Sequence, residues 1–456
     1  MVSLYAASKK IYPRSVEGIF AYWRWICVVL TQLVFYGLPW FEWGTRQAVL
    51  FDLASRRFYI FGLVLYPQDF IYLTGLLVIS ALALFLFTAV AGRLWCGYAC
   101  PQTVYSDIFL WIERKVEGDR SARMRLDDAN FSMEKLVKKW YKHIIWIFFS
   151  IWTGFTFVGY FTPIRELAME FFQTQMSSWE LFWVFFYAFA TYGNAGFMRE
   201  QICKYMCPYA RFQSAMFDND TLIVTYDAER GEPRGPRAKS ADIGTLNLGA
   251  CVDCTLCVQV CPTGIDIRDG LQYECIGCGA CADVCDTVMD KLGYAKGLVR
   301  YSTQNAMDNK WTPQQIWQQL MRPRIQIYTM ILVAITVGLF VSLSLRTPFK
   351  VDVVRDRSTL SRITEYGTLE NVYRLQIMNA AEHEQTYQLN VKGLPQLKIT
   401  TQTVVKVDPA QARWIVLSAD IPYGSSDAGS HKIEFEVRAL GTDNVVFEKS
   451  VFIVPR

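Results

Sequence analysis

Eight cysteines between Cys251 and Cys285 constrain this chain more than any other feature. They form the pattern C-x₂-C-x₂-C-x₃-C twice, first in CVDCTLCVQVC and again in CIGCGACADVC. Two such runs in close succession are typical of bacterial-type ferredoxins, in which the fourth cysteine of each run ligates the cluster of the other run. The pattern therefore predicts two [4Fe–4S] clusters and a protein that transfers single electrons.

The crossed arrangement assigns four cysteines to each cluster. The first set is Cys251, Cys254, Cys257 and Cys285, and the second set is Cys275, Cys278, Cys281 and Cys261. Zinc is a weaker alternative, because it prefers isolated C-x₂-C pairs and would leave half of these thiolates without a role. A disulfide framework would require an oxidising compartment, and the membrane topology predicted below argues against one.

Long apolar runs predict a membrane protein. Hydrophobic residues make up 52% of the chain and aromatic residues 15%, which is high for a soluble protein. A helix needs about 20 apolar residues to cross a bilayer. We expect five such helices, at residues 18–41, Phe70–Gly92, His143–Phe161, Trp179–Phe197 and Ile325–Leu345. Phe58–Pro67 is apolar but too short to cross, so we expect an interfacial or re-entrant segment there.

The distribution of basic residues predicts the orientation of these helices. Five crossings put the two ends of the chain on opposite sides of the membrane. Residues 93–142 are rich in lysine and arginine, whereas residues 162–178 contain only Arg165. The positive-inside rule therefore predicts a multi-pass protein of the bacterial cytoplasmic (inner) membrane. Its N-terminus and ferredoxin region would be cytoplasmic, where thiolates remain available to iron, and its C-terminal domain periplasmic.

The chain changes character after Thr347. Residues 347–456 contain no cysteine and show seven or eight short runs of alternating apolar and polar residues, with turn signals such as Asp408-Pro409 between them. This pattern predicts a β-sandwich of the immunoglobulin type. Residues 221–237 begin as a short strand and continue with Gly, Pro and Arg, which is typical of a linker.

The expected fold is a polytopic α-helical membrane protein of about five transmembrane helices, with an inserted bacterial-type 2[4Fe–4S] ferredoxin domain and a C-terminal immunoglobulin-like β-sandwich. The expected parts are a membrane domain at residues 1–212, a cytoplasmic linker and ferredoxin-like domain at 213–320, the fifth transmembrane helix at 321–346 and the β-sandwich at 347–456. The net charge of +4 is small, and basic residues are not interleaved with stacking aromatics, so nucleic-acid binding has no support.

A second cysteine motif, C-x₃-C-P, follows two of the predicted helices. It begins at Cys96 and again at Cys203, and together the copies contain Cys96, Cys100, Cys203 and Cys207. On a helix, thiols at i and i+4 point the same way, and the proline is expected to end the helix. If the two copies meet, within one chain or across a homodimer, they offer four soft sulfurs suited to Cu(I), zinc or an iron–sulfur cluster.

The cysteines of this motif and the arginines beside it could also have purely structural roles. Cysteine is often a small buried apolar residue at a helix end, although two copies with the same trailing proline favour a metal or redox role. Three arginines flank the motifs, Arg93, Arg199 and Arg211. They would either anchor the protein at the cytoplasmic membrane surface or compensate the charge of thiolates, and the sequence leaves both roles open.

These features together resemble the cbb₃-type cytochrome c oxidase accessory proteins, the family variously called CcoG, FixG or RdxA. The resemblance covers essentially the whole chain, and its most specific part is the segment DNDTLIVTYDAERGEPRG that begins at Asp218. It implies a membrane iron–sulfur protein that reduces Cu(II) to Cu(I) for copper delivery to the oxidase. It also implies oxidase subunits and copper chaperones or transporters as partners, beside membrane lipid. Cys96, Cys100, Cys203 and Cys207 match the membrane motifs of that family.

Three functions stay open at this point. The first is a cupric reductase in which the ferredoxin clusters supply electrons to Cys96, Cys100, Cys203 and Cys207, which act as catalytic and metal-binding residues and hold copper or a further cluster. The second is an electron-transfer subunit that oxidises quinol and feeds a partner reductase, for which a quinone-sized pocket would speak. The third is a non-enzymatic scaffold for oxidase assembly. The residues do not name the electron donor.

Overall fold

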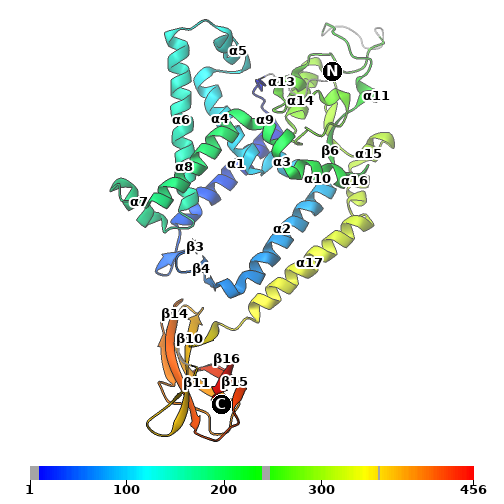
Figure 1. Ribbon diagram of the computed structural model, residues 1–456. Coiled ribbons are helices and arrows are strands. Elements are labelled where there is room, and N and C mark those ends of the chain that lie inside the picture. The colour runs from blue at the N-terminus through cyan, green and yellow to red at the C-terminus, as the bar shows by residue number, and fades with distance from the viewer. Residues whose placement is uncertain (1–9, 239–246, 358–359, 456) are drawn as a thin grey trace, which may run out of the picture. The chain divides into compact units, whose positions relative to one another are not determined.

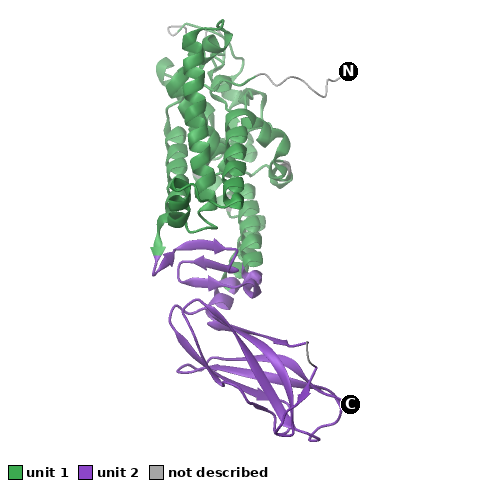
Figure 2. Ribbon diagram, turned by 60° about the vertical axis from the view of Figure 1, so that its left-hand side comes forward, with its two compact units in different colours: residues 1–42, 73–337 green, residues 43–72, 338–456 purple. Residues whose placement is uncertain are grey.

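The computed structural model describes residues 10–238, 247–357 and 360–455. The chain divides into two compact units, shown in green and purple in Figure 2. The first unit comprises residues 1–42 and 73–337, and the second comprises residues 43–72 and 338–456. Each unit is therefore assembled from two separate stretches of sequence, and the ferredoxin region falls in the same unit as α1 (Ile19–Gly37) and most of α2 (Phe70–Ala91) and α17 (Pro323–Ser344).

Among the residues that the structure describes, three helices are long and apolar enough to cross a membrane (Figure 1). They are α1 (Ile19–Gly37), α2 (Phe70–Ala91) and α17 (Pro323–Ser344). Only 6% of the apolar window of α1 is buried within the protein, and none of the corresponding windows of α2 and α17 is. Apolar helices with so little buried surface are suited to contact with lipid, and they match three of the five predicted spans in length and composition.

The other two predicted spans form a packed helix pair. They correspond to α6 (Met133–Val158) and α8 (Ser178–Gly193). The 16 residues of α8 are about 24 Å long at 1.5 Å per residue, and the helix continues directly into the π-helical segment η3 (Asn194–Met198). A Cβ added at Gly154 of α6 would lie 2.2 Å from the Val184 carbonyl oxygen of α8, so only glycine permits this close crossing. Whether this pair crosses the membrane remains a prediction.

The segment after α1 corrects the expectation that Phe58–Pro67 is interfacial or re-entrant. It belongs to an antiparallel three-stranded sheet of the second unit, formed by β3 (Val49–Asp52), β4 (Arg57–Ile60) and β5 (Leu63–Leu65). Tyr59 packs with Met378 of the β-sandwich in one small core, and the Tyr66 hydroxyl donates to the Asn379 carbonyl at 2.9 Å. The segment is apolar because it packs against the sandwich, not because it lies in lipid.

The predicted immunoglobulin-like sandwich consists of two antiparallel sheets. One has the order β12-β14-β10-β8 with β9 beside β10, and the other has the order β13-β11-β15-β16. Their bounds are β8 Phe349–Arg355, β9 Arg362–Ile363, β10 Thr368–Asn379, β11 Gln385–Lys392, β12 Lys398–Ile399, β13 Val404–Val407, β14 Ala412–Pro422, β15 Gly429–Ala439 and β16 Val445–Val454. Alternate residues such as Tyr373, Leu375 and Ile377 are fully buried between the sheets.

The ferredoxin region is a small α+β core within the first unit. Strands β6 (Ile223–Tyr226) and β7 (Val299–Ser302) pair antiparallel, and the region also contains α13 (Leu256–Val260) and α14 (Ala280–Leu292). Val224 and Tyr226 are buried in the same core as Met289 of α14. The residues expected to begin a linker at 221 therefore lie within the ferredoxin core.

Candidate functional site

The first ferredoxin set of cysteines surrounds one cavity. Its lining contains Cys251, Cys254, Cys257 and Cys285. The chain winds around this cavity through two residues with left-handed backbone, Asp253 at φ 53° and Thr255 at φ 56°. Burial raises the pKa of the Cys285 thiol to about 12, and repulsion from the other three cysteines of the set adds to this effect. The structure therefore brings together the four residues that the sequence pattern assigned to one cluster.

The second set surrounds a neighbouring cavity. Its lining contains Cys261, Cys275, Cys278 and Cys281, together with Cys257 of the first set. Burial raises the pKa of Cys281 well above its usual value, and repulsion from the three other members of its set raises it further. The Gly277 N–H donates to the Cys275 sulfur at 3.4 Å. Cys261 thus lies with the cysteines of the second run, as the crossed pattern predicts.

Four soft thiols around each cavity fit a [4Fe–4S] cluster. Among the described residues, no three His, Cys, Asp or Glu side chains converge tightly enough to hold a single metal ion. A single tetrahedral ion draws its thiolates to within about 4 Å of one another, since each metal–sulfur bond is about 2.3 Å long. The thiolates of a four-iron cluster stand farther apart because each binds a different iron atom. The doubled cysteine pattern, with four cysteines of one set lining each cavity, therefore suits clusters.

The first membrane motif is built around a break between two helices. Cys96 lies in the short helix α3 (Leu94–Tyr98), and Cys100 has extended backbone, with ψ 128°, just before α4 (Pro101–Glu117). Pro101 occupies the first turn of α4, where the missing N–H costs nothing. The proline therefore starts a new helix. The sequence predicted both thiols on one continuous helix, and the structure corrects this expectation.

The second membrane motif repeats this construction with a more distorted approach. Cys203 lies in the π-helical segment η4 (Ile202–Met206), and Cys207 is extended, with ψ 110°, before α10 (Pro208–Met216). Arg199, between η3 and η4, has a positive φ of 23°, which is costly for a residue with a Cβ. Backbone distortions and π-helical turns of this kind concentrate at functional sites.

The four membrane cysteines converge within one chain. Burial raises the pKa of Cys203 to about 12, and repulsion from Cys100, Cys96 and Cys207 raises it further. Burial likewise raises the pKa of Cys96 to about 11, against a hydrogen bond from Gln213 that lowers it. Of the two alternatives left open by the sequence, convergence within one chain is the one observed. We call these residues the membrane quartet: Cys96, Cys100, Cys203 and Cys207.

The membrane quartet is in direct contact with the second ferredoxin set. A Cβ added at Gly97 would lie 2.9 Å from the Cys278 Cα and 2.9 Å from the Ile276 carbonyl oxygen. Cys96 and Cys203 pack against the core that contains Ile276 and Cys278. The backbone of α3 therefore touches the loop that carries the second set, with no intervening layer of side chains at Gly97.

Arg93 lies between the membrane quartet and the second ferredoxin set. Its side chain is 6% exposed and donates to the carbonyl oxygens of Tyr273 and Ala210. Its positive charge opposes the effect of burial and lowers the pKa of Cys96, Cys203 and Cys275. Of the two roles left open for this arginine, the structure favours charge compensation.

The other two flanking arginines differ from Arg93. The Arg199 guanidinium forms an ion pair with the buried Glu113 carboxylate at 3.0 Å. Glu113 also pairs with Arg123 and Lys142 in the same network. Arg199 therefore has a carboxylate partner of its own near the second motif. The side chain of Arg211 lies outside the described residues.

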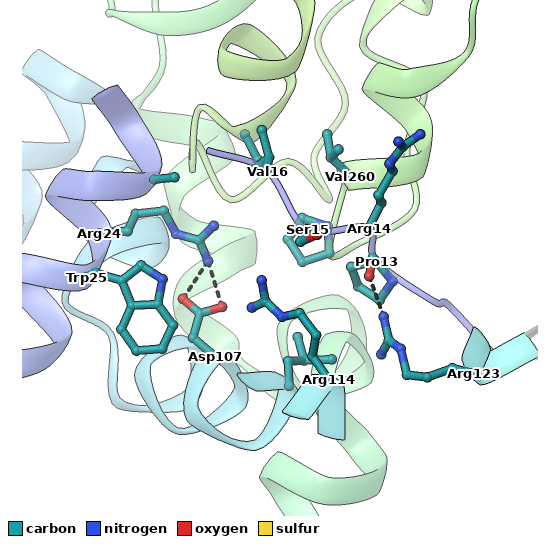
Figure 3. Close-up of a pocket in the computed structure, with 14 residues that line it drawn as sticks. Pro13, Arg14, Ser15, Val16, Arg24, Trp25, Asp107, Arg114, Arg123 and Val260 are labelled. Carbon is teal, nitrogen blue, oxygen red and sulfur yellow. Dashed lines mark hydrogen bonds and ion pairs between the residues drawn. The ribbon is translucent and has the colours of Figure 1, made fainter. Parts of the chain in front are cut away.

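A charged residue inside the first predicted span holds the first motif in place. Arg24 of α1 donates to the Gly97 carbonyl oxygen at 3.2 Å and to both Asp107 carboxylate oxygens, at 2.7 and 2.5 Å. Figure 3 shows this pair beside a small cavity lined by further arginines. Arg24 thus turns inward to Asp107. An arginine within an apolar run was the signal for such a partner.

Two more residues of the site escaped the sequence reasoning. Asp283 of α14 is 4% exposed and accepts hydrogen bonds from the backbone N–H groups of Phe20 and Ala21 at 3.2 and 2.8 Å. A ferredoxin carboxylate thus caps the first turn of α1. The fully buried Gln213 places its Nε2 atom 3.4 Å from the Cys96 sulfur. Neither residue stands in a recognisable motif, so only the tertiary contact reveals it.

Comparison with known families agrees with this arrangement. Residues 198–304 match a family described as a 4Fe-4S dicluster domain, and residues 73–117 match a 4Fe-4S binding domain. Residues 339–455 match the family of the IG-like fold at the C-terminal of FixG. The first match contains the second membrane motif and all eight ferredoxin cysteines, and the second match contains the first membrane motif.

Full-length relatives decide the family. The chain is 39% identical over 427 residues to the nitrogen fixation protein FixG of Rhizobium meliloti, across 86% of this chain and 81% of the relative. The chain belongs to the FixG/RdxA family. RdxB and RdxA of Cereibacter sphaeroides are 38% and 37% identical to it, over 96% and 95% of this chain and 95% and 94% of their own lengths.

The predicted FixG/RdxA family and the predicted combination of membrane helices, ferredoxin domain and immunoglobulin-like domain are confirmed. A solved FixG-related protein from Vibrio parahaemolyticus aligns with 24% of this chain and 97% of its own, at 25% identity and a TM-score of 0.22. This FixG/RdxA-family member is thus an iron–sulfur redox protein associated with the membrane and equipped with 4Fe–4S binding domains.

Proposed function

We propose that this chain reduces Cu(II) to Cu(I) at the membrane quartet, for copper delivery during assembly of a cbb₃-type cytochrome c oxidase. The observation that carries the proposal is the contact at Gly97, where α3 meets the Ile276–Cys278 loop. It joins a site of soft sulfurs directly to a one-electron carrier domain. Copper is the substrate, and soft thiolates favour it in the Cu(I) state.

The two ferredoxin sets are proposed to hold one [4Fe–4S] cluster each. Cys251, Cys254, Cys257 and Cys285 would bind the first cluster, and Cys261, Cys275, Cys278 and Cys281 the second. When bound, the clusters supply the single electrons that the reduction of Cu(II) requires. Because burial raises the pKa of the Cys281 and Cys285 thiols, loading with iron must displace their protons.

The chain's own residues prepare the membrane quartet for copper. The Arg93 guanidinium stabilises negative charge on Cys96 and Cys203, and the buried Gln213 amide contacts the Cys96 sulfur. Two thiolates are enough for Cu(I), so a copper site needs only one pair from the quartet.

A further iron–sulfur cluster at the membrane quartet is the competing assignment. The match of residues 73–117 to a 4Fe-4S binding domain supports it, because this stretch contains Cys96 and Cys100. In that arrangement the quartet would carry electrons and not the copper ion itself.

The proposal includes an orientation and partners. The N-terminus and ferredoxin region would face the cytoplasm and the β-sandwich the periplasm of a bacterial inner membrane, as the basic residues between positions 93 and 142 indicate. The copper would pass to oxidase subunits or to copper chaperones and transporters. The family resemblance supports these partners.

Measurement of iron content and of Cu(I) formation on the purified protein tests the proposal. Two clusters correspond to about eight irons per chain, and a third would raise the count to about twelve. Serine replaces Cys96, Cys100, Cys203 and Cys207 together, and Cys27→Ser, a lone cysteine in α1, is the matched control. The protein is first reduced with dithionite, the excess is removed, and Cu(II) is then added with a Cu(I)-specific chromophore. We expect the fourfold variant to lose Cu(I) formation while it keeps about eight irons.

The outcomes separate the assignments. Intact copper binding and Cu(I) formation in the fourfold variant would exclude the membrane quartet as the copper site. A drop from about twelve to about eight irons would assign a third cluster to the quartet. The control should match the unmodified chain in both measurements.

A further inference from the structure

A cavity of about 1030 Å³ lies in the first unit, beside the ferredoxin core. Its apolar wall includes Val90, Leu94, Leu222, Trp311, Ile316 and Trp317. This volume matches the upper end of the range of ordinary ligand pockets, about 300–1000 Å³, and the mixture of an apolar wall with a few polar groups is typical of them. Neither the proposed copper site nor the cluster sets use this cavity.

The cavity opens where two membrane-spanning helices end. Val90 is in the last turn of α2, and α16 (Pro313–Leu320), which contributes Ile316 and Trp317, leads directly into α17. Of these helices, α2 and α17 are long and apolar enough to cross the membrane. A ligand dissolved in the bilayer can therefore enter the cavity from the membrane boundary, and tryptophans are common at that boundary.

The charges around the cavity favour a neutral ligand. Every cation in its described lining has a partner. Three form ion pairs: Arg300 with Asp227 at 3.0 Å, Lys310 with Glu229 at 2.6 Å and Lys296 with Asp290 at 2.9 Å. Arg230 donates to the carbonyl oxygens of Ala295 and Lys296. A nucleotide would bring several negative charges and calls for cations that are free to meet them. The lining thus suits an uncharged amphipathic molecule better than a nicotinamide or flavin nucleotide.

One side chain connects the cavity to the second ferredoxin set. Tyr301 lines the cavity, and its hydroxyl donates to the Gly277 carbonyl oxygen at 2.7 Å. Gly277 lies between Cys275 and Cys278 in the chain. A ligand against Tyr301 is therefore one side chain away from the loop that carries two cysteines of that set.

We propose that this cavity binds a membrane quinol as the electron donor of the chain. The inference rests on the proposed function, which requires one-electron acceptors at the ferredoxin sets. Oxidation of one quinol breaks its two O–H bonds, releases two protons to water at the charged rim and gives up two electrons, one for each iron–sulfur cluster. Location at the membrane boundary, neutral lining and the Tyr301 link together point to this class of donor.

The test uses the full chain in lipid nanodiscs and a photoreactive azidoquinone. The variant Ile316→Glu places a carboxylate in the cavity wall, and Gln318→Glu places one on the exposed part of the same helix, outside the lining. We expect labelling of residues 304–320 that excess unlabelled quinone displaces. We also expect at least about tenfold weaker quinone binding in Ile316→Glu and unchanged binding in Gln318→Glu.

Two further readouts keep this inference separate from the proposed function. Anaerobic addition of a quinol should bleach the visible iron–sulfur absorption, while dithionite bleaches it without using the cavity. If dithionite-reduced protein forms Cu(I) but quinone neither labels nor binds the cavity, the donor assignment fails and the proposed function stands. If quinone binds but reduced protein forms no Cu(I), the donor assignment stands and the proposed cupric reductase function fails. Labelling that excess quinone does not displace, or equal labelling of both variants, overturns the inference.

Discussion

Single residues set the distance between the membrane quartet and the ferredoxin core. Gly97 permits backbone contact with the loop of the second set, Arg93 supplies a buried positive charge between the two, and Gln213 contacts the Cys96 sulfur. Electron transfer depends steeply on distance, so a small displacement at this contact has a large effect. A single substitution at this contact is therefore expected to impair the proposed reduction of Cu(II).

Gly97→Ala tests this contact. Its Cβ would lie 2.9 Å from the Cys278 Cα, which forces the loop of the second set away at a cost of about 1–3 kcal/mol. We expect a lower Tm and slower Cu(I) formation by the pre-reduced protein, with unchanged iron content. Gly338→Ala in α17 is the control, because an added Cβ there meets nothing within 4 Å beyond the helix's own neighbouring backbone. A variant as stable and as fast as the control would show that the contact is not needed.

At the level of secondary-structure elements, helix ends join the ferredoxin core to the membrane helices. Asp283 of α14 caps the first turn of α1, and both C-x₃-C-P motifs place a cysteine just before a proline-initiated helix. The first N–H groups of a helix have no partner within the helix, so a carboxylate or thiolate at that point is stabilised. The unpaired N–H groups at a helix start thus bind the Asp283 carboxylate where α14 meets α1, and they stabilise a cysteine thiolate in each C-x₃-C-P motif.

Asp283→Ala tests the docking of α14 on α1. Loss of the cap should cost about 0.5–2 kcal/mol, whereas Asp283→Asn retains one of the two oxygens that accept from Phe20 and Ala21. We expect faster hydrogen exchange of these amides in the alanine variant and a much smaller effect in the asparagine variant. Asp290→Ala, which removes an exposed ion pair on the same helix, serves as control. Equal exchange in Asp283→Ala and the control would contradict the capping role.

At the scale of the whole molecule, separated stretches of sequence combine into each unit. The second unit joins residues 43–72 to the β-sandwich. Asp69 is 2% exposed and forms ion pairs with Arg346 at 3.0 Å and Lys350 at 2.5 Å. The loop between the first two membrane helices is thereby tied to the residues that follow the last one.

Asp69→Asn tests this tie. It leaves two cations without their carboxylate, and we expect a loss of about 1–3 kcal/mol from the second unit, seen as a lower Tm in calorimetry. Glu384→Gln removes an ion pair whose side chains are 51% and 66% exposed, which should change stability by at most about 1 kcal/mol. If the two variants lose the same small amount, residues 43–72 contribute little to the second unit.

The orientation of the chain has a test of its own. All 13 native cysteines lie at or before Cys285, so the β-sandwich has none. We expect Ser425→Cys, at an exposed turn, to react with a membrane-impermeant maleimide on intact spheroplasts. Reaction only after permeabilisation would place the sandwich in the cytoplasm and reverse the proposed topology. The unmodified chain reports the background from native cysteines.

The sequence by itself determined the ligand chemistry and the element types. Cysteine spacing predicted both ferredoxin sets because a cluster dictates its own local spacing, and alternation and long apolar runs predicted strands and helices because side chains repeat with the geometry of each element. The apolar run Phe58–Pro67 was misread, because its composition suits lipid and a small protein core equally well.

The tertiary structure alone decided which distant residues meet. It brought the two C-x₃-C-P motifs into one quartet, placed Gly97 against the second ferredoxin set and paired Arg24 with Asp107. Such contacts join residues up to some two hundred positions apart, and each single residue involved is ordinary in its local context. They follow from how the packed elements fit together in space, which no short stretch of sequence encodes.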